Sequence, residues 1–73
     1  MTYDYSKLKG RIIERCGTTR EFAKSMGLSE RTVSLKLSNQ VAFKQDDIEK
    51  AITVLGLKEK DIQQYFFQKY VQQ

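Results

Sequence analysis

The chain has 73 residues, with thirteen Lys and Arg, nine Asp and Glu, and a formal net charge of +4. A chain of this length buries only about 60% of its unfolded surface, so we expect one domain over residues 1–73 and no second module. His is absent and Cys occurs once, which removes the commonest general base and metal ligand and any internal disulfide, so we expect neither an enzyme nor a cofactor or metal site.

The apolar spacing predicts five helices and no strand, so the expected fold class is all-α. In the first helix the apolar residues recur at steps of three and four. These residues are Tyr5, Leu8, Ile12 and Cys16. Gly17 is expected to end this helix, and Cys16 is read as a small thiol on its apolar side rather than as a nucleophile.

Capping residues mark the second and third helices. Thr18 followed by Glu21 is a capping-box pattern, which predicts a helix that starts there and ends at Gly27. Ser29 is a favourable N-cap for the third helix. The inward residues of the third helix are predicted to be Val33 and Leu37.

The second half of the chain predicts a loop and two further helices. Either Val41 or Phe43 is expected to anchor the loop to the core. The fourth helix has apolar residues at i, i+3, i+4 and i+7, namely Ile48, Ala51, Ile52 and Leu55. Gly56 is expected to close it. The fifth helix is predicted over residues 58–71, with apolar side chains on two sides.

Residues 19–39 have the spacing of a helix-turn-helix formed by the second and third helices. Ala23 permits the two helices to approach closely, and Gly27 permits the turn between them. Leu28 and Val33 are expected to lock the third helix onto the second. The same spacing also occurs in other packed pairs of short helices, so the outward residues carry the functional argument.

The outward face of the third helix suits base contacts in the major groove of DNA. The candidate base-reading residues are Ser29, Glu30, Arg31, Ser34 and Leu35. Arg31 can bond guanine O6 and N7 together, and Leu35 can contact a thymine methyl group. Glu30 can accept from cytosine N4 or brace Arg31. The alternative for each of them is an ordinary solvated helix surface.

Residues that flank this helix are the candidates for contacts with the DNA backbone. They are Thr19, Arg20, Lys36, Ser38, Asn39 and Lys44. Residues 1–40 hold eight Lys and Arg against four acids, whereas residues 41–73 hold five of each sign. The excess positive charge therefore lies in the half that contains the helix-turn-helix, which favours a polyanionic partner.

The run EFAKSMGLSERTVSLKLSN, with its continuation VAFKQDDIEKAITVLGL and the ending QYFFQKYV, resembles the lambda-repressor/Cro class of phage regulators. It is most similar to small single-domain Cro-like proteins of phages of Gram-positive bacteria. The resemblance implies a compact five-helix DNA-binding fold, operator binding and repression of a phage or prophage switch. Many members have an apolar residue at the position of Lys36 and a polar one at that of Leu35, so either residue could face DNA.

Two partner hypotheses remain open from the sequence. One is a double-stranded DNA operator bound by a homodimer, because a single module reads few base pairs. Its dimer surface would be Tyr65, Phe66, Phe67, Tyr70 and Val71, which could instead pack on the core. The other is a protein-binding modulator that uses the same fold to engage a repressor or RNA polymerase. No small-molecule ligand is expected. Short apolar runs and the lack of a secretory signal predict a cytoplasmic protein without membrane contact.

Overall fold

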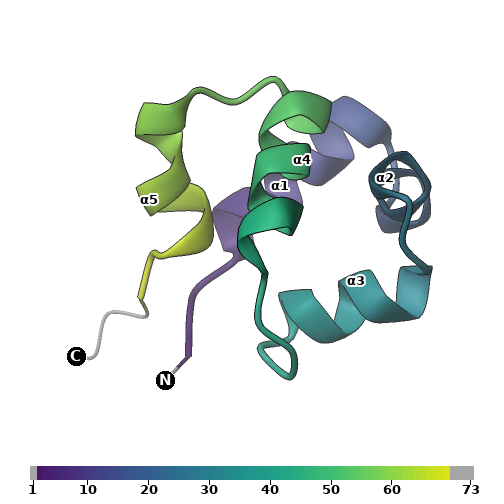
Figure 1. Cartoon of the computed structure of the whole chain (residues 1–73), viewed down its shortest axis with the longest axis horizontal. Coiled ribbons are helices and arrows are strands. Elements are labelled where there is room, and N and C mark those ends of the chain that lie inside the picture. The colour runs from purple at the N-terminus through teal and green to yellow at the C-terminus, as the bar shows by residue number, and fades with distance from the viewer. Residues whose placement is uncertain (1, 70–73) are drawn as a thin grey trace.

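The computed structural model describes residues 2–69 (Figure 1). These residues form five α-helices and one short 3-10 helix. The elements are α1 (Ser6–Cys16), α2 (Thr19–Met26), α3 (Glu30–Leu37), α4 (Gln45–Leu55), η1 (Glu59–Asp61) and α5 (Ile62–Phe66). Within the described range, β pairing is limited to one isolated antiparallel bridge, which joins Tyr3 and Lys69. The all-α prediction is therefore confirmed. No helix in this range has the length and apolar character needed to cross a membrane.

Every α-helix contributes to one apolar core. The buried residues are Tyr5, Leu8, Ile12, Phe22, Ala23, Met26, Val33, Leu37, Ala51, Leu55, Leu57 and Phe66. Burying a large apolar side chain contributes about 1.5–3 kcal/mol, whereas an exposed ion pair such as Arg11–Glu14 contributes about 0–1 kcal/mol. Apolar packing therefore sets the positions of the helices. Cys16 is half-buried and packs against this core, on the apolar side that its spacing predicts.

The predicted helix boundaries of α2 and α3 are confirmed by their caps. The Thr18 hydroxyl accepts from the Glu21 backbone N–H at 3.1 Å, and the Ser29 hydroxyl accepts from that of Thr32 at 3.1 Å. Gly27 ends α2 at φ 72°, in the left-handed region that a side chain would strain. The chain can therefore turn between α2 and α3 within three residues.

The helices α2 and α3 cross steeply over a shared apolar contact. Figure 1 views α2 almost along its axis and α3 from its side. Ala23 is 1% exposed where the two helices meet, and Val33 is buried on the facing side of α3. Two short helices joined by a tight turn are what the spacing predicts here, and their use as a DNA-binding helix-turn-helix stays a prediction. Phe43, rather than the exposed Val41, anchors the following loop to the core.

The last helix is shorter than the sequence predicts. A helix is predicted over residues 58–71; up to residue 69, where the description ends, the structure has η1 and then α5, which ends at Phe66. After Phe67 the chain turns to lie beside its own beginning, where the Asp4 backbone N–H donates to the Gln68 carbonyl at 2.6 Å. The apolar pattern continues past Phe66, but pairing with the N-terminal segment replaces further helix.

Candidate functional site

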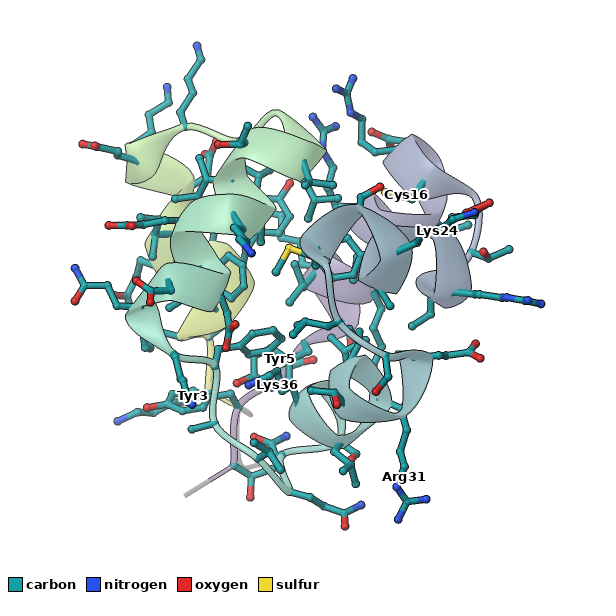
Figure 2. The ribbon with its side chains drawn as sticks, turned by 45° about the vertical axis from the view of Figure 1, so that its right-hand side comes forward. Tyr3, Tyr5, Cys16, Lys24, Arg31 and Lys36 are labelled. Carbon is teal, nitrogen blue, oxygen red and sulfur yellow. The ribbon has the colours of Figure 1, made fainter. Side chains whose placement is uncertain are left out.

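The outward face of α3 is polar and accessible. Ser29, Glu30, Arg31 and Ser34 are exposed, and Leu35 is half-buried. Figure 2 shows the Arg31 side chain extending away from the body of the molecule. The structure therefore brings the five candidate base-reading residues together on α3 and its N-cap, with Arg31 projecting into solvent.

Two serine hydroxyls at the ends of α3 are already engaged within the chain. Ser29 Oγ accepts from the Thr32 backbone and lies 2.8 Å from the Thr32 hydroxyl. Ser38 Oγ donates to the Leu35 carbonyl at 3.1 Å and accepts from the Gln40 amide at 3.1 Å. Both hydroxyls are exposed, so a contact with DNA would have to share or replace these bonds.

The predicted phosphate contact of Lys36 is wrong. The residue is 3% exposed, and Nζ lies 2.9 Å from Asp47 Oδ2 and donates to the Ala42 carbonyl at 3.0 Å. Nζ also lies 5.9 Å from the centroid of the Phe43 ring. A charge this deeply buried is stabilised by its partners and cannot reach a phosphate outside. The rotation of α3 follows: Lys36 faces inward and Leu35 lies toward the surface.

Asp47 is the partner that makes this burial possible. Its carboxylate also accepts from the Lys44 backbone N–H at 2.9 Å, at the start of α4. Partial burial alone would raise the pKa of Asp47, but the hydrogen bonds from Lys36 and the Lys44 backbone, together with the positive charges of both lysines, hold the pKa below its usual value. One carboxylate thus joins α3 to α4 and caps α4.

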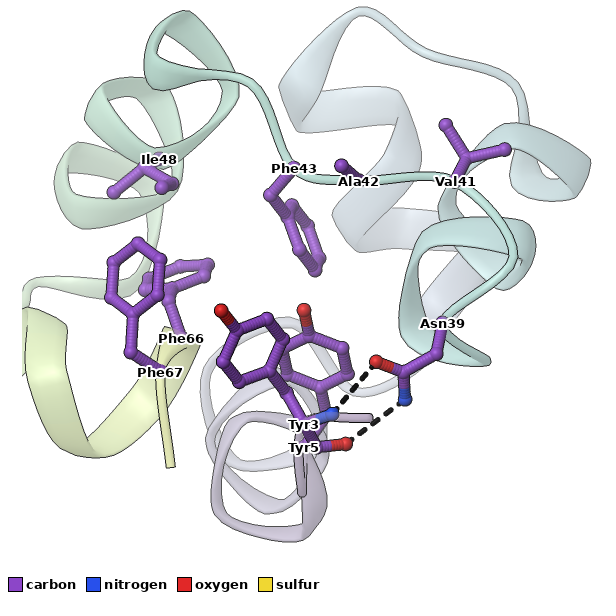
Figure 3. Close-up of a pocket in the computed structure, with 9 residues that line it drawn as sticks. All are labelled: Tyr3, Tyr5, Asn39, Val41, Ala42, Phe43, Ile48, Phe66 and Phe67. Atoms are coloured by element: carbon purple, nitrogen blue, oxygen red, sulfur yellow. Dashed lines mark hydrogen bonds between the residues drawn. The ribbon is translucent and has the colours of Figure 1, made fainter. Parts of the chain in front are cut away.

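Asn39 holds the N-terminal segment against the end of the helix-turn-helix. Its side-chain oxygen accepts from the Tyr3 backbone N–H at 2.9 Å, and its side-chain nitrogen donates to the Tyr3 carbonyl at 2.9 Å (Figure 3). Its backbone has a φ of 67°, which Asn tolerates better than most residues. Both ends of the amide bond Tyr3, while Nδ2 keeps a second N–H, so a contact of Asn39 with phosphate stays a prediction.

The other candidates for backbone contacts keep accessible positions. Thr19 is half-buried as the first residue of α2, and Arg20 and Lys44 are exposed. The free N–H groups at the start of α2 and the helix dipole favour an anion near Thr19 and Arg20. Their contact with phosphate stays a prediction.

An aromatic cavity that the sequence analysis did not identify lies between the N-terminal segment, the loop before α4 and the end of α5 (Figure 3). It has a volume of about 230 Å³ and is lined by Tyr3, Tyr5, Asn39, Val41, Ala42, Phe43, Ile48, Phe66 and Phe67. Phe43 packs edge-on against Tyr5 and Phe66, each at 5.3 Å between centroids. Burial raises the pKa of the Tyr5 hydroxyl, and the neighbouring Tyr3 adds a smaller rise. The sequence feature that could have indicated this cavity is the pair of aromatic residues near each end of the chain.

The predicted dimer surface is only partly accessible. Phe66 is 1% exposed and belongs to the core, so its assignment to a dimer surface is wrong. Tyr65 is half-buried beneath Lys7, whose Nζ lies 5.6 Å from its ring centroid, and Phe67 is 38% exposed. Tyr70 and Val71 lie outside the described residues.

Comparison with known proteins relates the chain to a phage regulator. The model of the family described as "Protein of unknown function (DUF739)" matches residues 1–69. The solution structure of the modulator of repression (MOR) of the temperate bacteriophage TP901-1 from Lactococcus lactis is similar, with 57% identity and a TM-score of 0.82. The match covers 99% of this chain and 97% of that one. No curated protein matches. The chain belongs to the DUF739 family.

Proposed function

We propose that the chain is a protein-binding modulator that acts on a phage repressor. The observation that carries this proposal is the 57% identity, over almost the whole of both chains, to a phage modulator of repression. The fold that surrounds α3 supports it, because Lys36 and Asn39 are both engaged internally. Fewer groups remain beside α3 to clamp a DNA backbone than the sequence predicts.

Direct binding to the repressor tests this proposal. The repressor encoded by the same phage or prophage genome would be titrated with the chain in a calorimeter, and its operator affinity measured with and without the chain. A modulator must form a complex and must change operator affinity, by about tenfold or more for a clear effect of about 1.4 kcal/mol. Absence of a complex, with an unchanged operator affinity, would refute the proposal.

DNA binding through α3 is the second candidate function, favoured by the exposed Arg31 and Ser34 on one face and by the positive charge of residues 1–40. A homodimer on two half-sites about 34 Å apart would read a palindromic operator, and repression would follow from occupying it. Selection of bound sequences from a random duplex pool tests this candidate. Enrichment of a palindrome supports it, and failure to enrich any sequence contradicts it.

Two arginine variants separate base reading from backbone contact. Arg31→Ala should lower specific binding by about 1–3 kcal/mol and relax the preference at one base pair. Arg20→Ala should weaken binding to every sequence and reduce the salt slope by about 1. Band shifts across a salt series measure both effects. If Arg31→Ala binds its site as well as the unaltered chain does, Arg31 does not read bases.

A further inference from the structure

A groove between α4 and α5 combines an apolar floor with acidic side chains. It has a volume of about 620 Å³, and its apolar lining residues are Phe43, Ile48, Ile52, Ile62 and Phe67. Ile48 and Ile52 lie one helical turn apart on α4, while Ile62 starts α5 and Phe67 follows its end. The three isoleucines are half-buried and Phe67 is 38% exposed. The floor is therefore accessible apolar surface continuous with the aromatic cavity, with which it shares Phe43, Ile48 and Phe67.

The ionisable residues that line this groove are both acidic. Glu49 and Glu59 are exposed, and neither forms an ion pair with another described residue. These two carboxylates are opposite in sign to the net charge of +4 of the whole chain. They would give a basic partner seated in the groove both attraction and orientation.

We infer that this groove binds a basic amphipathic helix of a partner protein. Apolar side chains at i, i+3 or i+4, and i+7 of such a helix would lie on the isoleucines and Phe67, as in other helix-in-groove complexes. Its Lys or Arg side chains would face Glu49 and Glu59. That the partner is a repressor rests on the proposed function. That the bound helix is basic and amphipathic rests only on the residues that line the groove.

A matched pair of peptides tests the chemistry of the groove. Both peptides are helical and carry Leu in the same amphipathic pattern, and the remaining positions are Lys in one and Glu in the other. The full chain should bind the Lys peptide at least about tenfold more tightly. NMR shifts should be largest at the methyl groups of Ile48, Ile52 and Ile62. Equal affinity for the two peptides, or shifts centred on α3, would overturn the inference.

Charge reversal in the groove should reverse the preference. The variant Glu49→Lys/Glu59→Lys should bind the Glu peptide more tightly than the Lys peptide. The matched control Glu14→Lys/Glu21→Lys changes the net charge equally but on α1 and α2, and it should keep the original preference. Circular dichroism melting verifies that both variants fold. If the control reverses the preference as well, net charge rather than the groove selects the peptide, and the inference is wrong.

The same variants separate this inference from the proposed function. If the repressor binds the unaltered chain and the control alike but binds the groove variant at least about tenfold more weakly, both proposals are supported. If the repressor binds all three equally, the groove assignment is wrong and the proposed function stands. If the repressor binds none of them, the proposed function is wrong, and the peptide experiment alone decides the groove.

Discussion

The outward face of α3 and the aromatic cavity are built from opposite kinds of residue. The first is polar, exposed and placed in the half of the chain with excess positive charge, whereas the second is aromatic and largely buried. Two polar contacts lie behind α3: Lys36 joins it to Asp47 of α4, and Asn39, which follows α3, bonds Tyr3 at the cavity. The comparison teaches that the outward face of α3 is positioned from behind, by polar contacts of residues that lie off that face.

Removal of the buried Lys36 ammonium group should have the largest effect on the stability of the fold around α3. Lys36→Met keeps the apolar stem but leaves the Asp47 carboxylate without its partner, which should cost about 3 kcal/mol in the free energy of unfolding. Urea unfolding measures the loss. Lys36→Met/Asp47→Asn should recover part of it, and Lys44→Met, at an exposed position, should cost less than about 0.5 kcal/mol. An unchanged stability of Lys36→Met would mean that the pair does not hold α3.

The two hydrogen bonds between Asn39 and Tyr3 should contribute less to the free energy of unfolding than the Lys36–Asp47 ion pair. Asn39→Gly keeps the left-handed backbone and removes two hydrogen bonds, so it should lose about 1–3 kcal/mol. Asn39→Ala should be about 1 kcal/mol less stable again, because Cβ without a local hydrogen bond is strained at φ 67°. Chemical denaturation of the two variants compares these effects. Equal stability of Asn39→Ala and the unaltered chain would contradict both.

Acid should weaken the Lys36–Asp47 ion pair and leave the hydrogen bonds between Asn39 and Tyr3 unchanged. The folded state holds the pKa of Asp47 below its ordinary value of 3.8, so this contribution is fully present above about pH 4 to 5 and is lost as the pH falls through the depressed folded pKa. Stability measured between about pH 5 and pH 2 should fall less steeply for Asp47→Asn than for the unaltered chain. Asp46→Asn, at an exposed position of the same helical turn, is the matched control. A parallel pH profile for Asp47→Asn would exclude this linkage.

Two glycines give the smallest effects and separate stability from recognition. Gly10→Ala in α1 meets no neighbour within 4 Å and should stabilise the chain by about 0.5–1 kcal/mol. Gly56→Ala should destabilise it by about 1 kcal/mol, since φ is 64° and the new Cβ would lie 3.3 Å from Arg15 Nη2. Thermal melts should move in opposite directions. Neither residue lines the cavity or lies on α3, so partner affinity should stay constant in both variants.

The helices were predictable because their signals are local. Thr18 and Ser29 cap the residues that follow them, and Gly27 and Gly56 end helices where the backbone becomes left-handed. The burial of Lys36 was not predicted, because its partner Asp47 lies eleven residues away across a loop. Many members of the lambda-repressor/Cro class, which the sequence resembles, have an apolar residue at the position of Lys36, and this difference was a usable signal.

The cavity and the end of α5 depend on contacts that sequence spacing does not encode. Tyr3 was outside every predicted helix, yet it meets Phe67 with ring centroids 5.8 Å apart. The pattern around Phe66 favoured a longer helix, because periodicity cannot show that the chain will pair with its own beginning instead. Ser29, Glu30, Arg31 and Ser34 are exposed, as the spacing predicts, and their contact with DNA bases stays a prediction, because exposure alone does not identify a ligand.

The bridge between Tyr3 and Lys69 turns residues 3–69 into a closed ring. Closing so long a loop costs chain entropy, and only a few backbone hydrogen bonds between its two ends offset that cost. This closure is therefore expected to form late during folding and to open early under native conditions. Hydrogen exchange should detect the opening at the Asp4 amide, which donates across the ring to Gln68, before the amides of α1 and α4 begin to exchange.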